Sequence, residues 1–348
     1  MNSRNREIDY IKACMAILII LYHYTTRYAE MLEKNPFPIR ISNGGTVGVA
    51  IFFTISAIYS MQGVEKEHNV NLVRYMFGKV LRLYPAYFAS IIIIFAVTSI
   101  YKVPMLSISW KSFLANLFLI QRFCGIDAVD GAHWYIAFLL VMYFWLWVIY
   151  NTSAYKRFET YLIWIAVSTL FSMDFFEPFG VSLPIIFGTK FNALMNIITL
   201  ERYSSYVIIG IMLFFLSEKM ERKWIFIIGI CFVKTTIYVG TLNATVIFLL
   251  VLLVFFSYIG KLHISKIYVL DYIGSISYAL YLIHQNIGYA ILDAFDKAGI
   301  SQEWSIIVPI IVATALATAI TYLVEKPIYE YVKARRKLKC LHSITPPL

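Results

Sequence analysis

The stretch DYIKACMAILIILYH, residues 9–23, decides the fold of this chain. It contains a lysine, Lys12, and a histidine, His23, with no charged residue between them. A helix would separate these two residues by roughly 16 Å along its axis, about half of a bilayer core. Ionisable groups at such a depth cost a few kcal/mol and usually belong to a functional site. The stretch therefore predicts a membrane-spanning helix that carries part of a site.

The composition of the whole chain agrees with this prediction. Of its 348 residues, 60% are hydrophobic and 14% are charged, whereas a soluble domain has about 25% charged residues. Apolar runs long enough to cross a bilayer alternate with short charged loops. We therefore expect an all-α, polytopic membrane protein with a single transmembrane domain over residues 1–348 and a basic cytoplasmic tail at 328–348. We expect no cleaved signal, because the first run lacks a small-residue cleavage site.

About ten runs qualify as spans, and the basic residues between them orient the chain. With the N-terminus inside, 19 Lys and Arg residues fall in inner segments and nine in outer segments. The positive-inside rule then places both termini in the cytoplasm. The net charge of +10 follows this topology and does not indicate a nucleic-acid partner. The expected spans are 8–28, 46–62, 84–101, 133–151, 158–174, 203–217, 224–239, 244–260, 272–291 and 304–324.

Two segments between the spans need separate interpretation. The apolar segment 113–120 is too short to cross, and a crossing there would move Lys156 and Arg157 to the outer side. We expect it to be a re-entrant or interfacial helix, because irregular backbone is tolerated where it lines a cavity. The segment 175–202 is the longest outer connection. It either shapes an entrance to the site or only connects two spans.

The ionisable residues of the first span each have two interpretations. Lys12 lies about one turn inside the cytoplasmic face, with Asp9 three residues before it as a partner for an ion pair. The lysine either extends to the lipid headgroups or binds an anion in a cytoplasmic cavity. His23 either bonds to a neighbouring helix or acts as a general base or acyl acceptor, because its nitrogen lone pair suits both roles.

Glycines begin the second span, and an arginine precedes the third. Gly45 and Gly48 allow close helix packing, and Ser56 can bond across helices. Pro85 is expected at the first position of the third helix. Arg82 is either a positive-inside anchor or a clamp for phosphate or pyrophosphate, which suit arginine geometry.

Further polar and aromatic residues occur in the later spans. Trp134 at the outer end of the fourth span fits an aromatic-belt anchor. Lys234 lies within the seventh span and needs a partner or a wet cavity. His284 lies in the outer half of the ninth span, and Pro327 is expected to end or bend the tenth helix. The four cysteines have no close pair and no metal-ligand spacing, so we expect free thiols.

Together these elements resemble the acyltransferase 3 family of integral membrane acyltransferases from Asp9 to Pro327. The family's Asp-x-x-Arg, followed by ten residues and His, is matched by Asp9, Lys12 and His23, with lysine in place of arginine. The later motifs are matched in the family's order by Gly45, Gly48, Val49, Phe52, Phe53 and Ser56 (with Ala57 in place of glycine), by Arg82, Tyr84 and Pro85, by Trp134, Tyr135 and Ile136, by Ser277, Tyr278, Tyr281, Leu282 and His284, and by Glu325, Lys326 and Pro327.

The resemblance implies a specific reaction. An acyl group, usually acetyl, would move from cytoplasmic acyl-CoA to a hydroxyl of an extracytoplasmic polysaccharide or lipid-linked glycan precursor. His23 would be catalytic, and Lys12, Arg82 and Tyr84 would bind acyl-CoA. The residues that would support the site or bind the acceptor are Asp9, Ser56, Trp134, Tyr278, His284 and Glu325.

The resemblance also implies partners and a location. Acetyl-CoA would be the acyl donor, no metal would be needed, and the protein would lie in the cell membrane. Its partners would be acyl-CoA, a surface glycan and membrane lipids, with a homo-oligomer allowed and no nucleic acid. Two other functions stay open: a transporter or flippase, although the spans lack two matching halves, and a sensor without turnover, which would need neither buried histidine.

Overall fold

The structure is a computed structural model that describes residues 5–32, 40–66, 71–101, 106–121, 124–172, 189–300 and 305–342. Every regular element in these ranges is a helix, so the all-α prediction is confirmed. Seven helical stretches of the described chain are long and apolar enough to cross a membrane, as expected of a polytopic membrane protein. They are Arg6–Met31, Gly44–Lys66, Leu72–Tyr101, Gly131–Asn151, Leu194–Glu218, Thr241–Tyr258 and Ile307–Ala334.

The other three expected spans are also helical, but they differ in length or polarity. α7 covers Phe158–Leu170 and has only 13 residues. α11, Arg222–Val239, is long enough but includes three basic residues. α13, Tyr268–Lys297, contains a central polar run that includes His284. The total of ten spans and the cytoplasmic location of both termini stay predictions.

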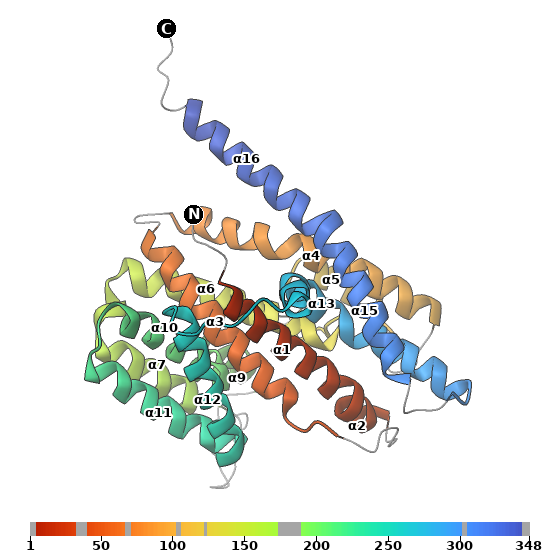
Figure 1. Ribbon diagram of the computed structural model, residues 1–348, viewed down its shortest axis with the longest axis horizontal. Coiled ribbons are helices and arrows are strands. Elements are labelled where there is room, and N and C mark those ends of the chain that lie inside the picture. Colours follow the sequence, from red (N-terminus) through yellow and green to blue (C-terminus); the bar gives the residue numbers. More distant parts are fainter. Residues whose placement is uncertain are drawn as a thin grey trace. The chain divides into compact units, whose positions relative to one another are not determined.

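The chain divides into two compact units, and the first comprises Met1–Met76, Arg122–Gly125 and Trp134–Ser275. Its centre is α3, Gly44–Lys66, which runs beside α1 (Figure 1) and also packs against α6, α10 and α12. α10 is buried over nearly its whole length. The helices of this unit around α3 are α1 (Arg6–Tyr22), α2 (Tyr28–Leu32), α6 (Trp134–Asn151), α7, α9 (Thr189–Thr199), α10 (Ser204–Glu218), α11 and α12 (Thr241–Tyr258).

Glycines explain how closely α3 meets its neighbours. A Cβ atom on Gly48 would lie 2.5 Å from Ile19 Cγ1 of α1, and one on Gly210 would lie 2.5 Å from the carbonyl oxygen of Thr54. The close packing predicted for Gly48 is therefore confirmed. In α11, by contrast, a Cβ atom on Gly229 would meet nothing within 4 Å.

This difference gives a stability prediction. We expect Gly48→Ala to lower the free energy of unfolding by about 1–3 kcal/mol, because the added methyl group overpacks the contact with Ile19. Gly229→Ala is the matched control and should raise stability by about 0.5–1 kcal/mol, because alanine loses less backbone freedom on folding. Thermal melting of the detergent-solubilised variants measures both. Equal melting temperatures for the two variants would contradict the packing argument.

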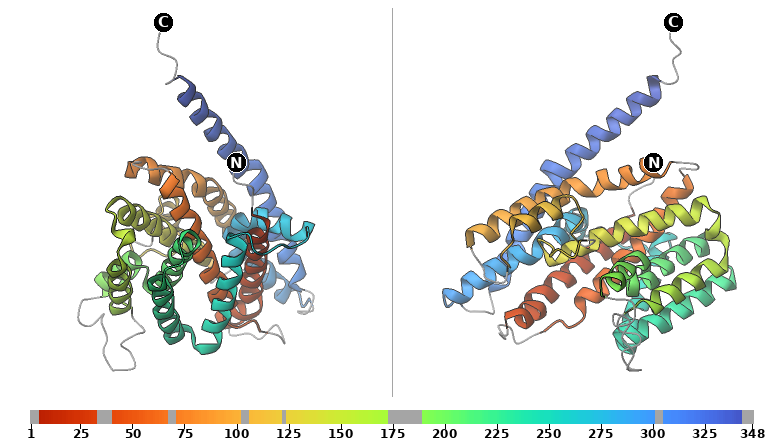
Figure 2. Two further views of the ribbon diagram at one scale, coloured as in Figure 1. Left: turned by 60° about the vertical axis from the view of Figure 1, so that its left-hand side comes forward. Right: turned by 180° about the vertical axis from the view of Figure 1, so that it is seen from behind.

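α11 and α12 form a helical hairpin whose outer side is apolar. Gly240, with φ of 78°, makes the turn between them, and Figure 2 shows the two helices side by side. Ile237, Leu249 and Phe256 are all exposed on this hairpin. Such a surface suits lipid contact, as expected for a multi-pass membrane protein.

The second unit comprises Phe77–Gln121, Ile126–His133 and Ile276–Leu348. It contains most of α4, Leu72–Tyr101, which begins well before the expected start at residue 84. The prediction that Pro85 occupies the first helical position is therefore wrong, because Pro85 lies inside the helix. Residues 72–84 have no proline and continue the helix backwards. Pro85 costs α4 one backbone hydrogen bond without ending it.

The C-terminal helices contain a second proline, Pro327, for which an end or a bend of the helix was expected. α15 (Ile307–Ala319), the π turn Ile320–Glu325 and α16 (Lys326–His342) follow one another as continuous helix (Figure 1). Pro327 therefore does not end the helix. It lies two residues after the end of the π turn. The wider bonding of that turn already interrupts the regular backbone ladder, so the missing N–H of proline is tolerated there.

Two expectations about connecting segments are modified by the structure. The short helix expected at 113–120 is present as α5, Trp110–Leu117, although its placement at the membrane stays a prediction. The segment 175–202 is not only a loop, because α9 and the 3₁₀ turn Glu201–Tyr203 occupy its second part. Asp174, Glu177, Pro178 and Pro184, which lie in or next to this connection, are outside the described residues.

Candidate functional site

His23 lies where the first helix changes its geometry. α1 ends at Tyr22, and a π turn runs from His23 to Arg27. Such turns occur frequently at functional sites. The half-buried imidazole meets the Tyr22 ring edge-on, with centroids 5.2 Å apart. Gly45 of α3 accommodates that ring, since a Cβ atom there would lie 2.8 Å from it. The glycine motif of α3 thus supports the residue beside His23.

Lys12 forms the predicted ion pair with Asp9. Lys12 Nζ lies 3.2 Å from Asp9 Oδ1, and the two side chains are 27% and 11% exposed. The ammonium also lies 6.0 Å from the centroid of the Tyr59 ring in α3. Gly274, at the start of α13, allows close approach to α1, because a Cβ atom there would lie 2.5 Å from the Asp9 carbonyl oxygen. A carboxylate and an aromatic ring therefore hold the lysine within the first unit.

Ser56 and Trp134 contact other helices of the same unit. Ser56 Oγ of α3 lies 3.5 Å from the hydroxyl of Tyr135 in α6, which confirms the predicted bond across helices. Trp134 stacks on Tyr203, with ring centroids 4.7 Å apart and planes inclined by 28°. Phe53 also contacts Tyr135, at 4.7 Å between centroids. The motifs of α3 and α6 therefore form one aromatic contact.

Within the second unit, three further motifs lie together. The hydroxyl of Tyr278 in α13 donates to the carbonyl of Leu83 in α4 at 2.9 Å. Tyr84, next in α4, donates its hydroxyl to the carbonyl of Leu117 in α5 at 2.8 Å. Arg82 is exposed and interacts electrostatically with Glu325, at the end of the π turn. The structure therefore groups the residues predicted around Arg82 with Tyr278 and Glu325.

The second unit also contains a buried carboxylate that the sequence interpretation did not select. Asp130 is fully buried and accepts hydrogen bonds from the N–H groups of Ala132 at 2.8 Å and Asn286 at 2.9 Å. Burial raises the pKa of Asp130 to about 7, and the two N–H donors oppose this rise. His284 is also fully buried, and its Nδ1 lies 2.9 Å from the carbonyl of Tyr281. The sequence offered one signal for this buried carboxylate, because Asp130 lies just before the expected span 133–151.

Comparison with known families agrees with the motifs. The chain matches the acyltransferase 3 family, described as an acyltransferase domain, over residues 5–326. The chain belongs to the acyltransferase 3 family. Searches among curated proteins and among solved structures returned no match. Family membership and the apolar helices together make the protein a multi-pass membrane acyltransferase.

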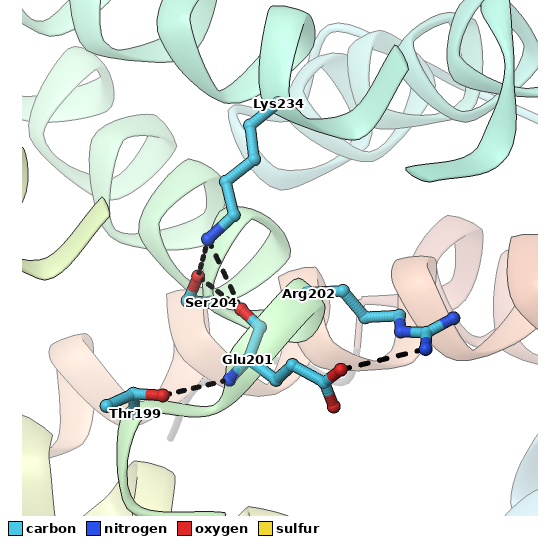
Figure 3. A network of polar contacts seen from close by, with 5 residues as sticks. All are labelled: Thr199, Glu201, Arg202, Ser204 and Lys234. Atoms are coloured by element: carbon cyan, nitrogen blue, oxygen red, sulfur yellow. Dashed lines mark hydrogen bonds and ion pairs between the residues drawn. The ribbon is translucent and has the colours of Figure 1, made fainter. Parts of the chain in front are cut away.

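The structure supplies the partners that Lys234 of this acyltransferase requires. The lysine is only 4% exposed, and its Nζ donates to Ser168 Oγ at 2.5 Å, to Ser204 Oγ at 2.9 Å and to the Glu201 carbonyl at 3.3 Å. Figure 3 shows the lysine reaching the turn before α10, while the Glu201 carboxylate points toward Arg202. Neutral oxygens therefore satisfy the three ammonium protons, and they join α7, α10 and α11 of the acyltransferase.

Lys234→Met should destabilise the acyltransferase by about 1–3 kcal/mol. The substitution removes the ammonium donor of three buried oxygens, those of the Ser168 and Ser204 hydroxyls and of the Glu201 carbonyl. The two hydroxyls keep their bond to each other, but we expect the lost bonds to outweigh the gain from removing a buried charge. Lys223→Met, an exposed lysine of the same helix, is the control and should change stability by less than about 0.5 kcal/mol. Tryptophan fluorescence during thermal unfolding measures the melting temperature of each variant. Equal melting temperatures for the two variants would contradict the account.

The remaining candidate chemistry concerns thiols and metals. Cys14, Cys124 and Cys231 are free, as expected, and the side chain of Cys340 lies outside the described residues. In the described part of the acyltransferase, no group of three or more His, Cys, Asp or Glu side chains is placed to hold a metal ion.

Proposed function

We propose that this membrane acyltransferase transfers an acetyl or other short acyl group from cytoplasmic acyl-CoA to a hydroxyl of an extracytoplasmic polysaccharide or lipid-linked glycan precursor in the cell membrane. The main supporting observation is the arrangement of α1. Its Asp9–Lys12 ion pair lies near the N-terminus, and His23 begins the π turn at its other end. Helical geometry separates Lys12 from His23 by roughly 16 Å.

The acyl-CoA site would lie at the cytoplasmic end of this arrangement. CoA carries several phosphates, which basic side chains attract and orient. We assign the binding of these phosphates to Lys12 and to the exposed Arg82, with Tyr84 two residues after Arg82 in α4 as a further contact. The long pantetheine arm would then extend the thioester toward His23. The roles of Asp9, Ser56, Trp134, Tyr278, His284 and Glu325 would be to support the site or bind the acceptor.

The chemistry proposed at His23 is acyl transfer by general base catalysis. The imidazole takes the proton of the acceptor hydroxyl, whose oxygen attacks the thioester carbonyl. The carbon–sulfur bond then breaks, and the CoA thiolate leaves and receives a proton. The products are an ester on the glycan and free CoA. A second route, in which His23 carries the acyl group briefly, gives the same products.

Release of free CoA distinguishes this proposal from the transporter or flippase alternative. Proteoliposomes of the purified protein should release thiol from acetyl-CoA only when a polysaccharide extract from the cell surface is added. A thiol-reactive dye measures the release. Movement of the glycan across the bilayer without any thiol release would instead support the transporter.

A further inference from the structure

The turn of α13 that carries His284 is bonded to two side chains from outside its own helix. The N–H of Asn286 donates to Asp130 Oδ2 at 2.9 Å. The carbonyl of Leu282, four residues earlier, accepts from His133 Nε2 at 3.0 Å. The two peptide groups that bracket His284 thus each have a partner, and we name Asp130 and His133 the α13 clamp.

The α13 clamp is itself held rigidly. Asp130 Oδ1 accepts from the N–H of Ala132 at 2.8 Å, and the N–H of His133 donates to the carbonyl of Asp130 at 3.0 Å. Ser90 Oγ lies 3.4 Å from His133 Nε2, and the Tyr87 ring lies 5.0 Å from the imidazole. Both clamp side chains are fully buried, so bulk water cannot replace the bonds that they make.

Two more contacts fit the clamp segment to α13. The side-chain amide of Asn286 donates to the Val129 carbonyl at 2.8 Å. Gly131 lies so close to the side-chain amide of Gln285 that a Cβ atom there would overlap it. The segment 129–133 and the turn around residue 284 therefore have matching surfaces, and a shift of one moves the other.

The buried polar groups of the α13 clamp are unusual for a purely structural contact. Among the described residues, no lysine or arginine forms an ion pair with Asp130, whose bonds are to backbone N–H groups. A buried carboxylate without a cation costs free energy, which an apolar contact at the same place would avoid. The carboxyl group and the imidazole instead fix the directions of two peptide groups, the N–H of Asn286 and the carbonyl of Leu282.

We propose that the α13 clamp positions the imidazole of His284 for acyl transfer, which makes Asp130 and His133 positioning residues of that reaction. The inference rests on the proposed function, because it assigns this turn to the transfer. His284 Nδ1 lies 2.9 Å from the carbonyl of Tyr281, within the same turn. The donated N–H fixes the ring to the backbone that the clamp holds, so its Nε2 lone pair keeps one direction.

The test uses the full-length protein and two independent measurements. Asp130→Asn replaces one acceptor oxygen by a donor, and His133→Phe keeps a ring but removes the donor to Leu282. Asp127→Asn is the matched control, because it removes an exposed carboxylate from the same loop. Hydrogen exchange of peptides covering 280–290 reports the turn, and transfer from labelled acetyl-CoA to a surface polysaccharide extract reports the reaction.

We expect both clamp variants to exchange at least about tenfold faster in peptides 280–290, with unchanged exchange in α10. The kcat of transfer should fall about 10- to 100-fold, while the KM for acetyl-CoA changes less than about twofold, because donor binding is separate. His133→Gln, which retains an N–H donor, should restore most of the kcat. The control Asp127→Asn should match the wild type in both measurements.

Each contrary result has a distinct meaning. Unchanged exchange in peptides 280–290 would overturn the clamp, and faster exchange with unchanged kcat would overturn its role in the reaction. If the wild type transfers no acetyl group, the proposed function fails, whereas the exchange data still test the clamp. If Asp130→Asn exchanges faster throughout the chain, Asp130→Ser replaces it, because serine keeps an acceptor for Ala132 but cannot reach Asn286.

Discussion

His23→Ala should lower the kcat of acyl transfer at least about 100-fold, because general bases contribute about 10²- to 10⁴-fold to such reactions. Without the imidazole, the acceptor hydroxyl keeps its proton and attacks the thioester poorly. Binding of acetyl-CoA should be unchanged, because Lys12, which we assign to the CoA phosphates, lies near the other end of α1. Transfer of labelled acetyl to a polysaccharide extract, together with equilibrium binding of acetyl-CoA, measures both effects.

The control for this prediction is an exposed histidine in the same unit. His263 lies in the connection between α12 and α13. The variant His263→Ala should retain full transfer. Full activity in His23→Ala would remove His23 from the mechanism. Loss of both transfer and acetyl-CoA binding in that variant would show that the histidine acts on folding or on the donor.

Lys12→Gln should raise the KM for acetyl-CoA about tenfold, which corresponds to about 1.4 kcal/mol of lost interaction. The substitution removes the positive charge that we assign to the CoA phosphates and removes the ion pair between residue 12 and the mostly buried carboxylate of Asp9. Lys12→Arg should keep the KM close to the wild-type value, because arginine also pairs with carboxylates and phosphates. Steady-state kinetics with varied acetyl-CoA measure the difference.

A second lysine separates a local effect from a change in net charge. Lys219 is 80% exposed, and Lys219→Gln removes one positive charge away from the proposed site. It should leave the KM unchanged. Equal KM values for Lys12→Gln and Lys12→Arg would mean that the lysine only extends toward the headgroups and does not bind acyl-CoA.

Most of the helical architecture could be predicted from the sequence, because long apolar runs in a membrane protein form helices that satisfy their own backbone hydrogen bonds. The stretch 9–23 forms most of α1 and the start of the π turn that follows it, and glycines of α3 make close contacts with α1. The two prolines, Pro85 and Pro327, were less predictable. Pro85 was expected at a helix start and Pro327 at an end or a bend. α4 continues through Pro85 and α16 through Pro327, because local backbone geometry and packing outweighed the missing N–H.

The candidate site was predictable only where its parts are near in sequence or belong to a known motif. The Asp9–Lys12 pair follows from helical spacing. The partners of Lys234 and the bond between Asp130 and Asn286 do not, because they join segments 30 to 156 residues apart. No periodicity of the sequence reports such pairs, since polar contacts of this kind depend on tertiary packing.

Acyl transfer across the membrane is the central claim, and vesicles with separated substrates test it most directly. Proteoliposomes would enclose acetyl-labelled acetyl-CoA, with surface polysaccharide supplied only outside, and His23→Ala vesicles would serve as the control. The account predicts ester-linked label on the outer polysaccharide with wild-type protein and almost none with the variant. The account would be contradicted if the polysaccharide outside unbroken wild-type vesicles carried no label and the enclosed acetyl-CoA remained unreacted.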